Sequence, residues 1–361
     1  MQNTFWFLNT RSHTEDTAVT KQNLTRASGE LFRRAPDERF PTLDALLAHC
    51  RREKDESEDR WHPPRGLAPE PTPDGRLGLK AGADGLFALN DWSFGQLCGL
   101  ARVSKETVNR LAPVTAAQVL RETLPGGNKP LQLLTRGEGV RSVHGTAYTR
   151  LHNADLVGTL KDYATDFTPP QAGFNGATGL YCGEQDLFAF LIDPAGWAEI
   201  EGEAFAPGFF VWNSEVGKRS VGIQTFWFQA VCANHIVWDA VEVIDFSRKH
   251  TASVGDALGE IRRHVEQLVR KRDERRDGFL RVIRKAMEQT LGEDAEAVMK
   301  ELAKHGLARG IAKQAVEMVA GGRFTIFALV DALTRLAQKA ENAGDRTALD
   351  VQAAAVFALA A

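Results

Sequence analysis

Residues 209–240 read FFVWNSEVGKRSVGIQTFWFQAVCANHIVWDA, and this stretch decides the fold class. Two runs rich in aromatic and β-branched residues stand on either side of a short polar segment that contains Gly217. Aromatic and β-branched residues suit the pleated, half-buried surface of a strand, and a short polar segment with glycine indicates a turn. The stretch therefore predicts two antiparallel strands that turn at residues 215–218.

The same pattern predicts two more hairpins upstream. Residues 130–151 contain two strand-like runs around the turn sequence Gly137-Glu138-Gly139. Residues 178–193 contain another pair, with a turn at residues 183–186. Between these hairpins, Asn153 begins a predicted helix. The middle of the chain is therefore expected to form an antiparallel sheet built from hairpins.

Helical patterns surround this middle part in the sequence. Thr42 can cap a short helix at residues 41–50, and Asn90 or Asp91 and then Ser104 can cap the helices that follow. From residue 253 to 290, apolar residues recur at helical spacing, which predicts one long helix or two helices broken near Gly278. Shorter helices follow to the C-terminus. The sequence thus predicts an α+β fold: an antiparallel, hairpin-built sheet packed by helices, with a C-terminal helical region.

Composition divides the chain into three predicted parts. Residues 1–85 are expected to be a poorly defined N-terminal segment with a Pro-rich linker, because five prolines from Pro63 to Pro73 cannot sustain a helix or a central strand. Residues 86–250 are predicted to be an α+β core domain. Residues 251–361 are predicted to be the C-terminal helical region.

Bulk properties exclude several classes of protein. The 361 residues carry a formal net charge of -3, and the four cysteines include no C-x-x-C pair. The chain is therefore neither a disulfide framework nor a zinc-motif protein. No apolar run is long enough to span a membrane, and the first residues lack the plan of a secretory signal. These features predict a cytoplasmic protein that has no membrane contact.

Candidate catalytic groups are sparse. Cys232, His235 and Asp239 lie close in sequence, but alternation along a strand separates Cys232 from His235. No phosphate-binding loop occurs, and the acidic residues of the 183–193 hairpin lack a partner motif. We therefore expect no metal and no cofactor, and the catalytic residues stay unknown. The pattern favours a protein that is not an enzyme, while an enzyme that uses Cys232 or the acidic hairpin stays open.

The hairpin motifs resemble those of a phage- and plasmid-associated family called domain of unknown function 932. The resemblance rests on Asn213-Ser214, Gly217 and Val231-Cys232-Ala233-Asn234, and on an upstream segment with Tyr148 and Asn153. It covers the chain roughly from residue 86 onward, and the run after Val231 departs from the commoner Asn-Thr ending. The family has no established activity. The resemblance implies a mobile-element protein and favours a role in DNA metabolism.

Cations and aromatic rings alternate on two of the predicted hairpins. A single strand of DNA needs positive charge for its phosphates and ring faces for its bases. On this ground, six residues are predicted to bind nucleic acid: Arg136, Arg141, Tyr148, Arg150, Lys218 and Arg219. The basic run within residues 262–285 is a second candidate for backbone contact. The hairpin residues are equally compatible with side chains that face solvent or pack under a helix. For the basic run, a solvated helix face with i,i+4 pairs such as Glu266–Arg270 is the more usual outcome.

The predicted function is nucleic-acid binding, with single-stranded DNA favoured, in replication, recombination or annealing. Annealing proteins act through charge and stacking, and a homo-oligomer is compatible with that role. The alternative is a protein–protein interaction factor of a mobile element, either an inhibitor of host defence or an assembly component. Its expected mark is an exposed apolar patch at Phe226, Trp227 and Phe228.

Overall fold

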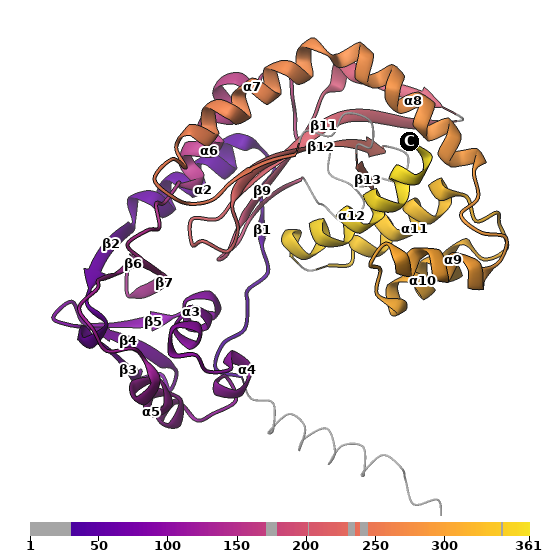
Figure 1. Ribbon diagram of the computed structural model, residues 1–361. Coiled ribbons are helices and arrows are strands. Elements are labelled where there is room, and N and C mark those ends of the chain that lie inside the picture. Colours follow the sequence, from indigo (N-terminus) through magenta and orange to yellow (C-terminus); the bar gives the residue numbers. More distant parts are fainter. Residues whose placement is uncertain (1–29, 171–178, 201, 230–234, 239–244, 341) are drawn as a thin grey trace, which may run out of the picture. The chain divides into compact units, whose positions relative to one another are not determined.

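The computed structural model describes residues 30–170, 179–200, 202–229, 235–238, 245–340 and 342–361 (Figure 1). The chain divides into two compact units. The smaller unit comprises the described part of Met1–Arg34 together with Trp61–Leu133 and Glu138–Val143. The larger unit comprises Ala35–Arg60, Leu134–Gly137 and His144–Ala361. Each unit therefore draws on more than one stretch of sequence, and the predicted boundaries at residues 85 and 250 do not coincide with this division.

The larger unit contains one sheet, in which eight strands lie within the described residues (Figure 1). The strand order is β1-β8-β9-β11-β12-β13, with β10 added beside β11 and β14 beside β12. Strands β8 and β9 pair antiparallel, as do β11 and β12, so the two hairpins predicted here are confirmed. The strands are β1 (Glu38–Arg39), β8 (Leu180–Cys182), β9 (Leu187–Ile192), β10 (Ala198–Ile200), β11 (Glu203–Asn213), β12 (Val221–Gln229), β13 (His235–Trp238) and β14 (Asp245–Arg248).

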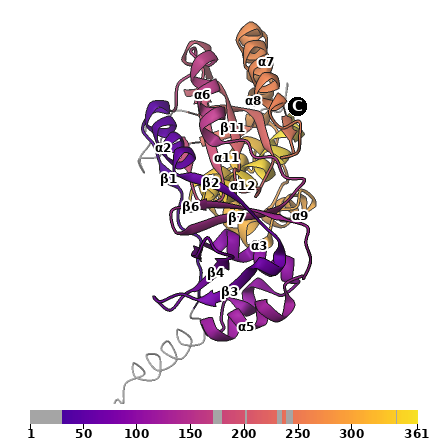
Figure 2. The same cartoon turned by 90° about the vertical axis from the view of Figure 1, so that its left-hand side faces the viewer.

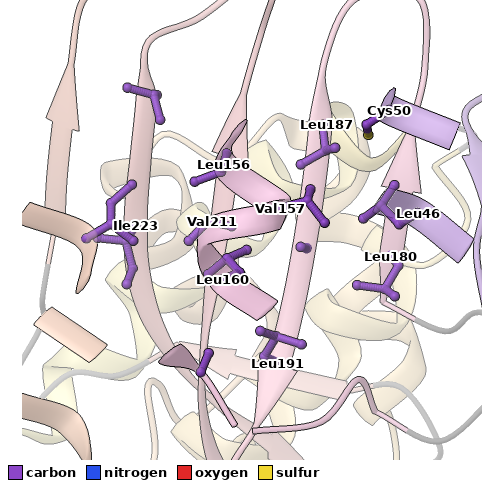
Figure 3. Packing of buried hydrophobic residues seen from close by; sticks show 14 of the residues in the cluster. Leu46, Cys50, Leu156, Val157, Leu160, Leu180, Leu187, Leu191, Val211 and Ile223 are labelled. Carbon is purple, nitrogen blue, oxygen red and sulfur yellow. The ribbon is translucent and has the colours of Figure 1, made fainter. Parts of the chain in front are cut away.

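Helices cover both faces of this sheet. Odd-numbered side chains of β9 and β11, such as Leu191 and Val211, pack against α2 (Leu43–Asp55), α6 (Asn153–Tyr163) and α7 (Asp256–Arg270). Figure 3 shows Leu156 and Leu160 of α6 in this layer. Even-numbered side chains, among them Phe190 and Phe210, form a second layer that includes residues of α12 (Ala343–Phe357). Because both faces are covered, these strands are apolar without alternation, and the α+β prediction is confirmed.

The C-terminal helical region is confirmed, but its predicted break is in the wrong place. Lys271 separates α7 from α8, and Gly278 is buried inside α8. Helix α7 packs on the cluster around α2 and α6, whereas α8 packs through Phe279 and Ile283 on a cluster shared with the helices that follow. The break therefore lets each helix turn its apolar face to a different core. These helices are α8 (Arg272–Glu288), α9 (Ala295–Lys304), α10 (Arg309–Val319) and α11 (Ile326–Ala337), with the short η2 (Pro194–Gly196) and η3 (Ala358–Ala360) elsewhere in the unit.

In the described part of the smaller unit, a sheet is packed by α3, α4 and α5, and Figure 2 shows α5 beside β3 and β4. The described strands of this sheet have the order β2-β6-β7-β5-β4-β3, and β5 and β7 run parallel. Asn90 caps α3 and Ser104 caps α4, as predicted. The elements are η1 (Pro64–Gly66), β3 (Leu67–Pro71), β4 (Leu77–Ala81), β5 (Leu86–Leu89), α3 (Asp91–Ala101), α4 (Lys105–Val108) and α5 (Pro113–Thr123), while β2 (Ser57–His62), β6 (Leu131–Arg136) and β7 (Gly139–Gly145) give residues to both units.

The prediction of a Pro-rich linker is wrong. Strand β3 pairs antiparallel with β4, with Pro69 opposite Leu79, and both Leu67 and Pro69 are buried. Strand β3 is the last strand in the order of its sheet, so it is an edge strand. An edge strand needs hydrogen-bond donors on one side only, so it tolerates proline where a central strand does not. Composition alone could not separate an edge strand from a linker.

None of the helices in the described ranges is long and apolar enough to cross a membrane.

Candidate functional site

Two of the predicted nucleic-acid-binding arginines are held by carboxylates of the same unit. Arg136, at the end of β6, lies 2.6 Å from Glu53 Oε1 and 2.8 Å from Glu56 Oε2. Arg150 lies 2.7 Å from Asp59 Oδ1, and only 3% of its side chain is exposed. Carboxylates of the protein itself therefore already balance the positive charge of each guanidinium.

The remaining predicted cations lie in separate places. Arg219 pairs with the buried carboxylate of Asp186 at 2.8 Å and lies over the ring of Phe188. Lys218 is exposed on the loop between β11 and β12. Arg141 is half-buried in the part of β7 that belongs to the smaller unit. Of the six predicted residues, Arg136 and Lys218 are exposed, whereas the side chain of Arg150 is buried.

Tyr148 lies in an aromatic stack rather than on an open face. Its ring stacks on His144 at 3.7 Å and on His250 at 5.4 Å, with Arg150 over it. The Tyr148 hydroxyl donates to the backbone carbonyl of Glu215 at 2.8 Å. Burial raises the pKa of Tyr148, and burial together with nearby Arg150 lowers the pKa of His144 to about 4. Both groups are therefore neutral at neutral pH, and their ring contacts are within the protein.

Residues of the family-like motif fasten the β11–β12 loop to the start of α6. Glu215 accepts the backbone N–H of Asn153 at 2.6 Å. Asn213 donates to Asn153 Oδ1 at 2.9 Å and to the carbonyl of Leu151 at 2.8 Å. Asn153 is the first residue of α6 and does not cap it, since His152 holds the cap position. In the described structure these motif residues therefore have a structural role.

Cys232, Asn234 and Asp239 lie outside the described residues. The prediction of an exposed apolar patch at residues 226–228 is wrong, because Phe226, Trp227 and Phe228 are all buried. Strand β12 has strands on both sides and helical cores on both faces, which leaves these rings no route to solvent.

The structure brings together one group of residues that sequence reasoning missed. His49 and Glu53 on α2 and Cys182 on β8 each place a ligand atom within 4.8 Å of the other two. A hydrogen bond to Cys182 raises the pKa of His49. A hydrogen bond with Cys50 and complete burial raise the pKa of Cys182. The signal for this group in the sequence was the His-x-x-x-Glu spacing at residues 49–53. The predicted helix ended at residue 50 and therefore did not include Glu53.

A further group consists of exposed cations on α7 and α8. Arg270, Arg281 and Arg284 are exposed, and no carboxylate of the described chain pairs with them. Lys285 is also exposed and donates to the carbonyl of Ala361 at 3.1 Å. Residues 281, 284 and 285 share one face of α8, because residues three and four apart are neighbours on a helix. This group is named here the α8 basic face: Arg281, Arg284 and Lys285.

Comparison of the chain with models of known protein families, with curated proteins and with solved structures gives no match. The resemblance to domain of unknown function 932 stays a prediction.

Proposed function

We propose that this protein binds nucleic acid by its phosphate backbone, and that the α8 basic face makes the main contact. The observation that carries the proposal is the exposure of Arg281 and Arg284 without a carboxylate partner in the described chain. Such cations neutralise phosphates and release counterions, which gives affinity without base recognition. With a net charge of -3, attraction to nucleic acid depends on a local cluster of this kind.

Three of the hairpin arginines that were predicted to bind nucleic acid are left out of the proposed interface. The guanidinium groups of Arg136, Arg150 and Arg219 already pair with carboxylates, so binding phosphate would require breaking an ion pair. Lys218, exposed on the β11–β12 loop, is the hairpin cation that we retain in the interface. Tyr148 is not included, since its ring already stacks within the protein.

The biological setting follows from the resemblance. Single-stranded DNA of a phage, plasmid or integrated element is the first ligand to test, in replication, recombination or annealing. We place this activity in the cytoplasm, where reduced cysteines are expected, and we expect a homo-oligomer to carry it. Among the described cysteines, Cys50, Cys98 and Cys182 are free thiols.

Fluorescence anisotropy with labelled single-stranded and duplex oligonucleotides tests the proposal. Arg281→Gln/Arg284→Gln should weaken binding roughly tenfold or more at low salt, and it should reduce the salt slope by about 1.4, at about 0.7 for each lost contact to a single strand. The matched control is Arg262→Gln/Arg263→Gln on α7, whose arginines pair with Glu266 and Glu260. Equal affinities of the two variants, or absence of binding at low salt, would contradict the proposal.

A groove between α9 and α10 supports the alternative, a protein–protein interaction factor. The groove measures about 810 Å³ and is lined by apolar residues such as Met299, Leu307 and Val316, with Lys300 and Glu317 among its charged residues. An apolar groove with a charged border suits an amphipathic helix. If Met299→Lys abolishes a host protein interaction and leaves oligonucleotide binding unchanged, this alternative replaces the first.

A further inference from the structure

We propose that His49, Glu53 and Cys182 bind one divalent metal ion, with Zn²⁺ as the preferred metal. Their ligand atoms lie within 4.8 Å of one another. Tetrahedral Zn²⁺ sites have bonds of about 2.0–2.3 Å, so their ligand atoms lie roughly 3.3–3.8 Å apart. A contraction of about 1 Å would therefore close the described group around an ion. The sequence predicted no metal site, because Cys182 lies 129 positions after Glu53 along the chain.

Rigid elements of the larger unit present the three ligands. His49 and Glu53 are one helical turn apart on α2 and so share a face. Cys182 ends β8, a strand of the central sheet that α2 contacts. The same helix is anchored by Leu46 and Cys50 in the hydrophobic layer shown in Figure 3. Ligands on packed helices and strands hold their positions better than ligands on loops.

Each ligand has a neighbour that suits an outer coordination role. Glu38 Oε2 lies 3.7 Å from His49 Nδ1, and His49 Nε2 lies 3.8 Å from Glu53 Oε2. Arg136 takes the other oxygen of Glu53, Oε1, at 2.6 Å. Asn153 Nδ2 donates to Cys182 Sγ at 3.9 Å. Carboxylates behind histidines and donors to thiolates are the partners that orient ligands in metal sites.

The donor set selects the metal. A neutral imidazole, a carboxylate and a thiolate together carry two negative charges, which balance a divalent ion. Nitrogen and sulfur ligands favour Zn²⁺ over Mg²⁺ or Ca²⁺, which prefer oxygen. Three protein ligands leave the fourth position of a tetrahedral ion for water.

Cobalt titration of the full chain, after removal of metal with a chelator, tests the site. Co²⁺ bound by a thiolate gives a sulfur-to-metal charge-transfer band, and Zn²⁺ should displace it. We expect one equivalent of Co²⁺ to saturate this band in the unmodified chain and the band to be lost in Cys182→Ser. Cys98→Ser is the matched control, since Cys98 is a buried free thiol of the smaller unit and should leave the band unchanged.

Two more variants keep the test decisive if Cys182→Ser does not fold. The variants His49→Gln and Glu53→Gln change side chains that are 13% and 12% exposed, whereas Cys182 is 1% exposed. Each should weaken Co²⁺ binding at least tenfold and remove the rise in melting temperature that Zn²⁺ gives the unmodified chain. A folded chain that shows no charge-transfer band overturns the proposal. So does a band that persists at full affinity in His49→Gln and Glu53→Gln.

Discussion

The carboxylate of Glu215 accepts the backbone N–H of Asn153 at 2.6 Å, and both residues are buried. Asn153 is the first residue of α6, so this N–H has no partner within the helix. A negative charge at that position also suits the partial positive charge of a helix N-terminus. The contact joins segments 62 residues apart and ties the β11–β12 loop to the helical layer.

Replacing Glu215 with Ala should destabilise the protein strongly. The substitution leaves the N–H of Asn153 buried without an acceptor, and we expect a loss of about 2–4 kcal/mol in the free energy of unfolding. Glu215→Gln keeps an acceptor oxygen and should lose less. Urea unfolding measures both, with Glu293→Ala as an exposed control expected to stay within about 0.5 kcal/mol. A Glu215→Ala variant as stable as that control would refute the role given to this contact.

Gly217 on the same loop is predicted to resist substitution for two reasons. Its φ is +75°, and a Cβ there would lie 2.5 Å from Cε1 of His144. Gly306 has nearly the same φ, +76°, but open space around it. Gly306→Ala should therefore cost about 1 kcal/mol from backbone strain alone, and Gly217→Ala should cost at least twice as much. Equal losses in thermal unfolding would show that the His144 contact does not restrict this position.

His144 should make stability depend on pH. Its pKa in the folded protein is about 4, below the ordinary value of 6.5, because burial and Arg150 disfavour its charged form. The unfolded chain therefore binds the proton first as pH falls. The contribution of His144 to the free energy of unfolding is therefore complete above pH 6.5 and is lost as the pH falls toward 4.

The variant His144→Gln isolates this effect. Glutamine does not titrate, yet its amide can still donate to the carbonyl of Val216, as the imidazole of His144 does at 3.0 Å. From pH 7.5 to pH 5.0 the unmodified protein should lose about 2 kcal/mol more than the variant, from the difference between the two pKa values. Parallel pH profiles of unfolding free energy for the two proteins would be the opposite result.

Sequence reasoning succeeded where structure is local and failed where it depends on distant partners. The strands of β11 and β12 were predictable because residue type and a nearby turn determine them. The ion pair between Arg150 and Asp59 joins residues 91 positions apart, so Arg150 looked like an available cation. The group of His49 and Cys182 was hidden for the same reason, since only the packing of α2 on β8 brings them together.

The stack of Trp227 on Phe279 is predicted to be a main support of the C-terminal helices. The rings lie 3.9 Å apart with 8° between their planes, and Phe205 meets Phe279 edge-on at 5.3 Å. Phe279→Ala should lower the free energy of unfolding by about 3–5 kcal/mol, because it opens a cavity where α8 meets the sheet. Val351→Ala on α12, 45% exposed, is the control and should change little.

Trp227→Phe should be milder than Phe279→Ala although it also removes ring volume. The indole N–H of Trp227 is buried with no hydrogen-bond partner in the described structure. Phenylalanine has no such donor, so the substitution relieves an unsatisfied polar group while it loses part of the stack. We expect a net loss below about 2 kcal/mol by urea unfolding. A loss equal to that of Phe279→Ala would mean that the indole N–H is satisfied in solution, and that the full indole, rather than a ring alone, supports α8.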